Sequence, residues 1–81
     1  MVKRFKLDRR DVEMSWVNNS RDLIRLRMLH RPTEIVIEGH EQPQNPKITS
    51  AQLGELRKQL EQDLWNSLTD KVAVHLRVPG R

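Results

Sequence analysis

The sequence predicts an α+β fold, in which a small antiparallel β-meander packs on one long amphipathic helix and a C-terminal strand returns to the sheet. Three observations predict it. Apolar and polar residues alternate in short segments of the first half, leucines recur at helical spacing over residues 49–68, and alternation resumes over residues 72–78. At 81 residues the chain is the length of one small domain.

The basic N-terminal part, residues 1–31, is predicted to consist of strands. Val12, Met14 and Trp16 share one face of a strand that ends at the turn-like residues 18–20. Two alternatives stay open for the residues before it. Either Phe5 and Leu7 extend a first strand, or Asp8 caps a short helix that runs through Trp16.

Residues 21–29 are also interpreted as a strand, because a helix would scatter their apolar side chains. As a strand, they place Arg25 and Arg27 on the face opposite Ile24, Leu26 and Met28. A turn at residues 30–32 then predicts a hairpin with a strand over residues 33–38, whose Ile35 and Ile37 point inward. Residues 40–47 contain two prolines and form the main loop.

The helix over residues 49–68 has a well-specified start. Thr49 and Gln52 fit a capping box, and Ile48 is placed to contact Leu53. The leucines of the helix share one stripe, with Arg57 inside the stripe and Trp65 beside it: Leu53, Leu56, Leu60, Leu64 and Leu68. After a turn at residues 70–71, Val72, Val74, Leu76 and Val78 alternate as a half-buried strand that ends at Pro79-Gly80.

The charge is unevenly distributed along the chain. Its 15 basic and 11 acidic residues give a net charge of +4 and a pI near 10.1. Residues 1–31 hold nine basic and four acidic residues, residues 32–70 hold three and seven, and residues 71–81 hold three basic residues and no acidic one. Two outcomes stay open, a solvated surface of mixed charge or a functional basic patch, and a polyanion site, if the chain has one, is expected on the N-terminal strands.

Nucleic-acid binding is the leading functional hypothesis. Arg25 and Arg27 would track a phosphate backbone from the hairpin, with an N-terminal arm that adds five more cations: Lys3, Arg4, Lys6, Arg9 and Arg10. Trp16 is the residue available for base stacking, although burial in the core is the competing interpretation of its position.

The alternative hypothesis is a protein-interaction module. A sheet with one helix exposes its edges, and a single-helix layer leaves apolar surface that a second copy can cover. The expected interface residues are Trp65, Arg57, Leu60 and Trp16. Such a module would be a homodimer, or a regulatory or inhibitory accessory protein of phage or plasmid type that acts on a host protein.

The inventory of reactive residues argues against an enzyme. The chain has no cysteine, which removes disulfides and thiolate zinc sites, and His30, His40 and His75 lack the spacing of metal ligands. Glu34 and Glu38 are too far apart on a strand for paired acid and base work, and no phosphate-binding or nucleophile motif is present. We expect no catalytic residue, metal, cofactor or small-molecule substrate. No apolar run reaches the length of a membrane span, so we expect a cytoplasmic protein without a membrane partner.

Two partial resemblances concern the second half of the chain. The runs TEIVIEGH, ITSAQLGELRKQLEQDLW and KVAVHLRV are similar to the strand-helix-strand half of ribosome hibernation factors. The hairpin followed by ITSAQLGELRKQL also resembles the end of single-strand binders of the positive-cofactor-four type. The first implies a strand after the helix and the second implies that the chain finishes at the helix, so neither supplies residues for transfer.

Overall fold

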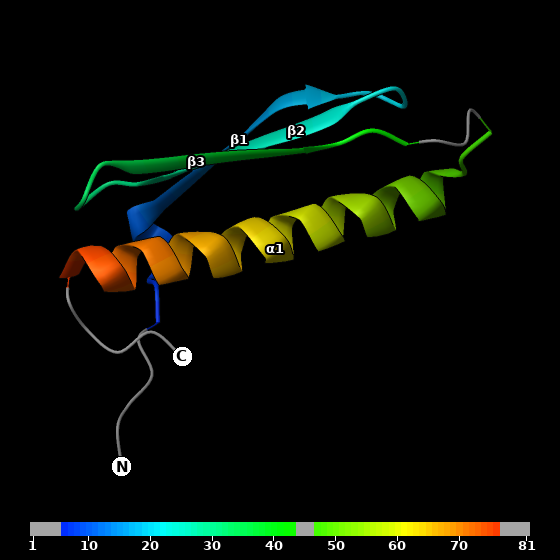
Figure 1. Cartoon of the computed structure of the whole chain (residues 1–81). Coiled ribbons are helices and arrows are strands. Elements are labelled where there is room, and N and C mark those ends of the chain that lie inside the picture. Colours follow the sequence, from blue (N-terminus) through cyan, green and yellow to red (C-terminus); the bar gives the residue numbers. More distant parts are fainter. Residues whose placement is uncertain (1–5, 44–46, 77–81) are drawn as a thin grey trace, which may run out of the picture.

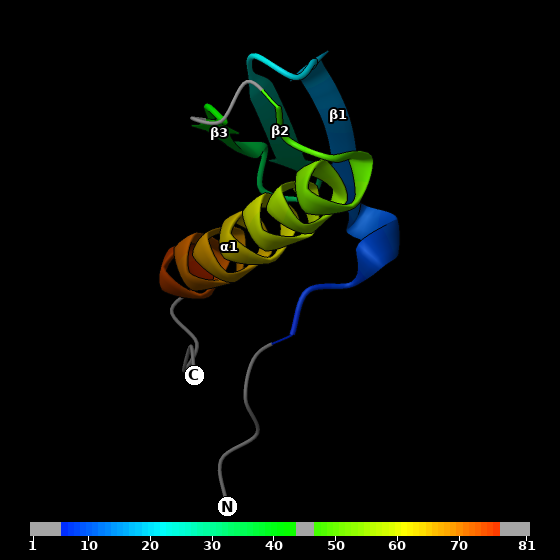
Figure 2. The ribbon, with the colours of Figure 1, turned by 90° about the vertical axis from the view of Figure 1, so that its right-hand side faces the viewer.

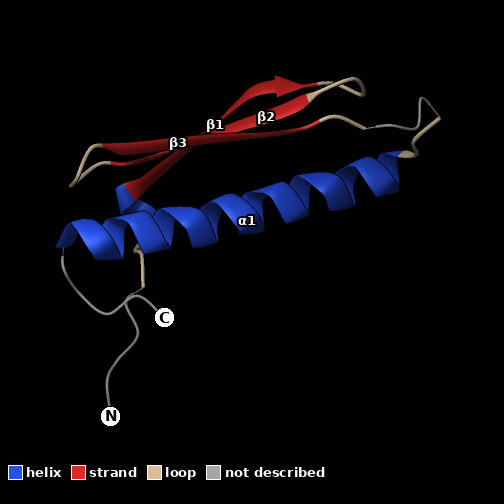
Figure 3. Cartoon of the chain, viewed as in Figure 1, coloured by secondary structure: helices blue, strands red, loops and turns tan. Residues whose placement is uncertain are grey.

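A three-stranded antiparallel sheet packs against one long helix in the computed structural model, which describes residues 6–43 and 47–76. A short 3₁₀ turn, η1 (Arg9–Asp11), precedes β1 (Val12–Asn19), β2 (Ile24–His30), β3 (Ile35–Glu41) and α1 (Ser50–Leu76). The strands are ordered β1-β2-β3, and both neighbouring pairs are antiparallel. The two layers are evident in Figures 1 and 3. The predicted α+β class, with a meander and one long helix, is confirmed.

The strand register places the alternating apolar residues on one face of the sheet. Met14 lies opposite Met28, and Met28 lies opposite Ile37. On the central strand β2, Ile24, Leu26 and Met28 are completely buried. The register of β1 shifts between Trp16 and Asn18, so Val17 forms a β-bulge on this edge strand.

The helix covers β2 and β3 (Figure 2). The predicted leucine stripe of the helix packs into the core. Leu53, Leu60, Leu64 and Leu68 are buried, while Leu56 is half-buried against the same core. Gly39 of β3 allows the close approach of the two layers. A Cβ atom at this position would lie 2.8 Å from Leu64 Cδ2 and 3.2 Å from Leu60 Cδ1.

The start of α1 has the predicted capping box. The backbone N–H of Gln52 donates to Thr49 Oγ1 at 3.1 Å, and the backbone N–H of Thr49 donates to Gln52 Oε1 at 3.0 Å. These reciprocal bonds satisfy two backbone donors that the first helical turn leaves without intrahelical partners. Ile48 and Leu53, the expected staple pair, are both buried in the core.

The predicted C-terminal strand is wrong over Val72–Leu76, because α1 continues to Leu76. Val72 lies four residues beyond Leu68 and therefore extends the buried stripe by another turn, and Ala73 is buried beside it. Val74, which alternation would have placed beside Val72, is 77% exposed. Val78 and the predicted end at residues 79–80 lie outside the described residues.

The N-terminal alternatives are also resolved in part. Asp8 does act as a cap, since its carboxylate accepts the backbone N–H of Arg10, but the helical turn that it caps ends at Asp11. The short helix through Trp16 is therefore wrong, and β1 begins at Val12. Leu7 is not part of a strand, and Phe5 lies outside the described residues.

The turns fall close to their predicted positions. Ser20 closes the β1–β2 connection, where its hydroxyl donates to the carbonyl of Leu23 at 3.1 Å. His30 belongs to β2 rather than to the following turn, and the carbonyl of His30 accepts the N–H of Glu34, which has a left-handed φ of 59°. β3 continues to Glu41, so the predicted loop over residues 40–47 begins two residues later.

Candidate functional site

The two arginines of the predicted nucleic-acid surface lie on the open face of the sheet, opposite the helix. Arg25 and Arg27 are exposed on the central strand β2, between the buried residues of that strand. Arg25 Nε lies 3.6 Å from Glu38 Oε1 of β3. Arg31, which follows β2, similarly lies 3.7 Å from Glu13 of β1. Carboxylates on both flanking strands thus offset much of the positive charge here.

Arg27 lines a shallow hollow of about 120 Å³ on this open face, together with Glu13, Ser15 and Leu29. Both described tryptophans lie elsewhere, since Trp16 shares the register of the core-facing residues and Trp65 is on α1. The open face therefore offers cations beside carboxylates, and its aromatic ring among the described residues is the small imidazole of His40, which lies opposite Arg25.

The charge of the described residues sums to zero. Four of the 15 basic residues lie outside the described ranges, whereas all 11 acidic residues lie inside them, so 11 charges of each sign remain. The four are Lys3, Arg4, Arg77 and Arg81. A polyanion site on the described part of the chain must therefore depend on local clustering and not on overall charge.

A second surface combines residues from both predicted sets. The guanidinium of Arg9 lies over the ring of Trp65, 5.3 Å from its centroid, which is within cation–π range. These two residues line a groove of about 450 Å³ between the N-terminal segment and α1. The rest of this Arg9–Trp65 groove is formed by Leu7, Lys58, Glu61 and Gln62.

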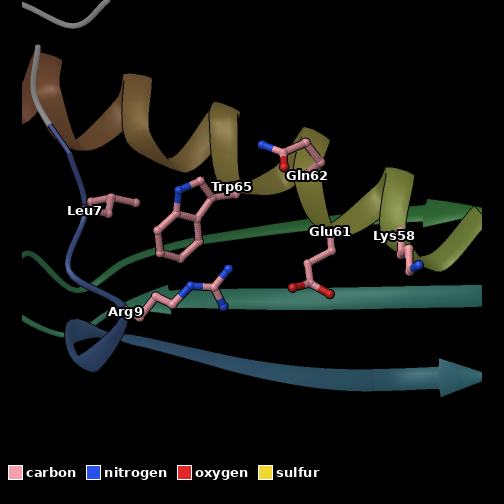
Figure 4. Close-up of a pocket in the computed structure, with 6 residues that line it drawn as sticks. All are labelled: Leu7, Arg9, Lys58, Glu61, Gln62 and Trp65. Carbon is pink, nitrogen blue, oxygen red and sulfur yellow. The ribbon is translucent and has the colours of Figure 1, made fainter. Parts of the chain in front are cut away.

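The groove residues come from two elements that meet on the helix side of the sheet (Figure 4). Arg9 extends from η1 beneath the indole of Trp65, and Glu61 points from α1 toward the same space. Lys58, Glu61, Gln62 and Trp65 are spaced by three or four residues and so share one face of the helix. From this spacing, the sequence could have predicted that Lys58, Glu61 and Gln62 lie on the same face of the helix as Trp65.

The other predicted N-terminal cations that the structure describes do not line the Arg9–Trp65 groove. Arg10 donates to the carboxylate of Asp8 through Nη2 at 2.9 Å and Nε at 3.2 Å. These bonds, together with the backbone N–H of Arg10, hold the pKa of Asp8 below its ordinary value of 3.8. Lys6 is exposed, and Arg4 lies outside the described residues. Arg9 and Arg10 are thus both on the surface, but Arg9 is the one that reaches the groove.

The remaining predicted interface residues support the fold. Leu60 is 5% exposed and belongs to the core. Arg57 donates through Nη1 to Asn19 Oδ1 at 3.0 Å, which ties α1 to the end of β1. Trp16 is half-buried and packs against the core, in agreement with the competing interpretation of its position.

Residues 6–43 and 47–76 contain neither a metal centre nor a membrane-spanning helix. No group of three or more His, Asp or Glu side chains within these ranges is arranged to hold a metal ion. His30, which is buried, bonds through Nδ1 to Thr33 Oγ1 at 2.8 Å. Within the same ranges no helix has the length and apolar character to cross a bilayer.

Comparison of the chain with family models, curated proteins and solved structures finds no match.

Proposed function

We propose that this protein is a non-enzymatic, cytoplasmic binding protein that holds single-stranded nucleic acid in the Arg9–Trp65 groove. The observation that carries the proposal is the contact between the Arg9 guanidinium and the Trp65 ring in a groove also lined by Lys58. Single-strand binders combine cations that hold phosphates with aromatic rings on which bases stack. This groove has both.

The polar residues of the groove add the means to contact a base edge. Gln62 carries an amide with donors and an acceptor, and Glu61 carries a carboxylate that accepts from the exocyclic amino groups of bases. Arg9 is exposed and lies over the ring of Trp65. Its guanidinium can therefore leave the ring and bind a phosphate, while a base stacks on the ring in its place. Trp65 is half-buried, which keeps the indole in place while part of it faces the groove.

The groove is favoured over the open face of the sheet for two physical reasons. First, Arg25 already has Glu38 as an ion partner, and a phosphate would have to displace this carboxylate or approach it closely. In the groove, Lys58 likewise lies 3.9 Å from Glu55, but Arg9 lies over the uncharged ring of Trp65. Second, the aromatic side chain of the open face among the described residues is the imidazole of His40, which gives bases a smaller stacking surface than the indole of Trp65.

Titration with defined oligonucleotides tests the proposal. The titration uses a Trp16→Phe variant, in which the fluorescence emission comes from Trp65. The probes are oligo(dT) and oligo(U) of about 12 nucleotides and a duplex of the same length, within the usual site size of small single-strand binders. We expect quenching of Trp65 by the single strands and a fall in affinity as salt rises.

Substitutions on the two faces of the molecule distinguish the groove from the sheet. Because Trp65→Leu removes the fluorophore, the affinities of these variants are measured by the fluorescence anisotropy of a dye-labelled oligo(dT). Trp65→Leu keeps an apolar side chain against the core and removes the stacking ring, so we expect affinity to fall roughly 5- to 150-fold. The double variant Arg25→Gln/Arg27→Gln is the matched control and should bind as the parent does. The proposal is wrong if no probe binds at low salt, or if the control loses affinity while Trp65→Leu keeps it.

A further inference from the structure

The outer edge of β1 is an unpaired strand edge, among the described residues, with an apolar strip beside it. In the three-stranded order β1-β2-β3, β1 pairs with β2 along one side, and α1 packs mainly on β2 and β3. Val12, Met14 and Trp16 of β1 share the core-facing side, as their pairing with His30, Met28 and Leu26 shows. Met14 is nevertheless 39% exposed, although its partner Met28 is completely buried.

We propose that two copies of this chain pair antiparallel along β1, with Met14 of one copy opposite Met14 of the other. This register uses residues 12–16, the regular part of β1 before the bulge at Val17. Free backbone N–H and C=O groups of an edge strand favour such pairing. The result is a continuous six-stranded sheet.

The side chains of β1 are self-complementary in this register. Val12 lies opposite Trp16 of the second copy, so an apolar strip formed by both copies runs across the two-fold axis and covers Met14. On the other face, Glu13 lies opposite Ser15 of the second copy, and no two carboxylates are directly opposed. The register therefore combines an apolar face with a polar face free of paired like charges.

The other sheet edge, β3, suits a second copy less well. Glu38 and Glu41 lie in β3, so two β3 edges would bring four carboxylates together. Charged residues of one sign on an edge strand are a known protection against edge pairing. β1 has one carboxylate, Glu13, which already pairs with Arg31.

Pairing along β1 has a geometric consequence for the groove. A two-fold axis perpendicular to the sheet places the helices of both copies on the same face of the six-stranded sheet. Because the Arg9–Trp65 groove lies on the helix side, the dimer presents two grooves on one face. The pairing itself does not depend on nucleic-acid binding and is tested without any ligand.

Sedimentation and directed crosslinking of the full chain test this inference. The chain has no cysteine, so Met14→Cys introduces a single thiol. Directly opposed residues of an antiparallel pair have Cα atoms about 4.5–5.5 Å apart, within disulfide reach. We expect mild oxidation to convert the Met14→Cys variant into a covalent dimer. Val36→Cys, at a site on β3 of similar exposure (43%), is the matched control and should remain monomeric on a denaturing gel.

The unmodified chain and a charge variant complete the experiment. The unmodified chain should sediment as a dimer, and Met14→Lys should weaken the dimer at least tenfold because two lysines then face each other. Val36→Lys should leave it intact. A monomer at the highest soluble concentration would overturn the inference, as would a disulfide that forms no faster in the Met14→Cys variant than in the Val36→Cys control. Far-UV circular dichroism establishes that each variant is folded.

Discussion

Arg9 and Trp65, which lie far apart in the sequence, meet with the guanidinium 5.3 Å from the ring centroid. Their contact links the segment before β1 to the middle of α1. We expect a double-mutant cycle with Arg9→Gln and Trp65→Leu to give a coupling free energy of about 0.5–1 kcal/mol in urea unfolding. Arg10→Gln combined with Trp65→Leu is the control pair and should be additive. Additivity of the first pair would mean that the contact does not contribute to stability.

The two described glycines should respond in opposite ways to alanine. Gly39→Ala forces a methyl group against Leu64 and Leu60, and we expect a loss of about 1–3 kcal/mol in the free energy of unfolding. Gly54 lies in α1, where an added methyl group would have no neighbour within 4 Å, so Gly54→Ala should stabilise the protein by about 0.5–1 kcal/mol. Urea unfolding of both variants measures the difference, and equal effects would contradict the close packing at Gly39.

Removal of the N-cap should destabilise α1 without altering the core. Thr49→Ala deletes the hydroxyl that accepts the N–H of Gln52, and we expect a loss of about 1 kcal/mol in the free energy of unfolding. Thr49→Ser keeps the hydroxyl and should retain most of that stability. Thermal unfolding of the two variants provides the measurement. A Ser variant as unstable as the Ala variant would show that the methyl group of Thr49 and not its cap contributes.

The last turns of α1 distinguish a helix from a strand. Val72 is completely buried, whereas Val74 is 77% exposed. Val72→Asp places a charge in the core and should cost several kcal/mol or prevent folding, while Val74→Asp should stay within about 0.5 kcal/mol of the parent. If residues 72–76 formed a strand with both valines on one face, the two variants would lose similar free energies of unfolding. Chemical denaturation, with circular dichroism as the signal, separates these outcomes.

The Asp8–Arg10 contact predicts a specific pH dependence. Hydrogen bonds from Arg10 hold the pKa of Asp8 below 3.8 in the folded protein, so the folded state binds this proton less tightly than the unfolded state. The stabilisation is therefore present above pH 3.8 and is lost as the pH falls through the lowered pKa. An NMR titration of the Asp8 carboxyl should show the lowered value, and Arg10→Gln should return it toward 3.8.

The sequence was sufficient to predict the meander and the helix start because each has a local physical cause. Alternation assigned Arg25 and Arg27 to the face opposite Leu26, and the Thr49–Gln52 pair defined the cap. The C-terminal strand failed because Val72, Val74 and Leu76 satisfy alternation, while Val72 also extends the stripe through Leu64 and Leu68. Both a strand and a helix therefore fit the local sequence, and the packing of Val72 against the sheet favours the helix.

The candidate site was predictable only in pieces. Trp65 was expected at the margin of the leucine stripe and Arg9 in a basic arm, but their contact requires the segment before β1 to lie on the helix side of the sheet. Such a contact depends on the tertiary arrangement and leaves no periodic pattern in the sequence. The ion partners of Arg25 and Arg31 are likewise on neighbouring strands, and alternation alone does not reveal them.

The net charge predicts opposite effects of salt on the proposed dimer and on the proposed nucleic-acid binding. Because those residues are neutral, the four cations outside the described ranges supply the whole net charge of +4. Two copies of net charge +4 repel each other, so screening by added salt should tighten the proposed dimer. The same salt should weaken the proposed binding of phosphate by Arg9 and Lys58. We therefore expect concentrated salt to favour the proposed self-association and dilute salt to favour the proposed nucleic-acid binding.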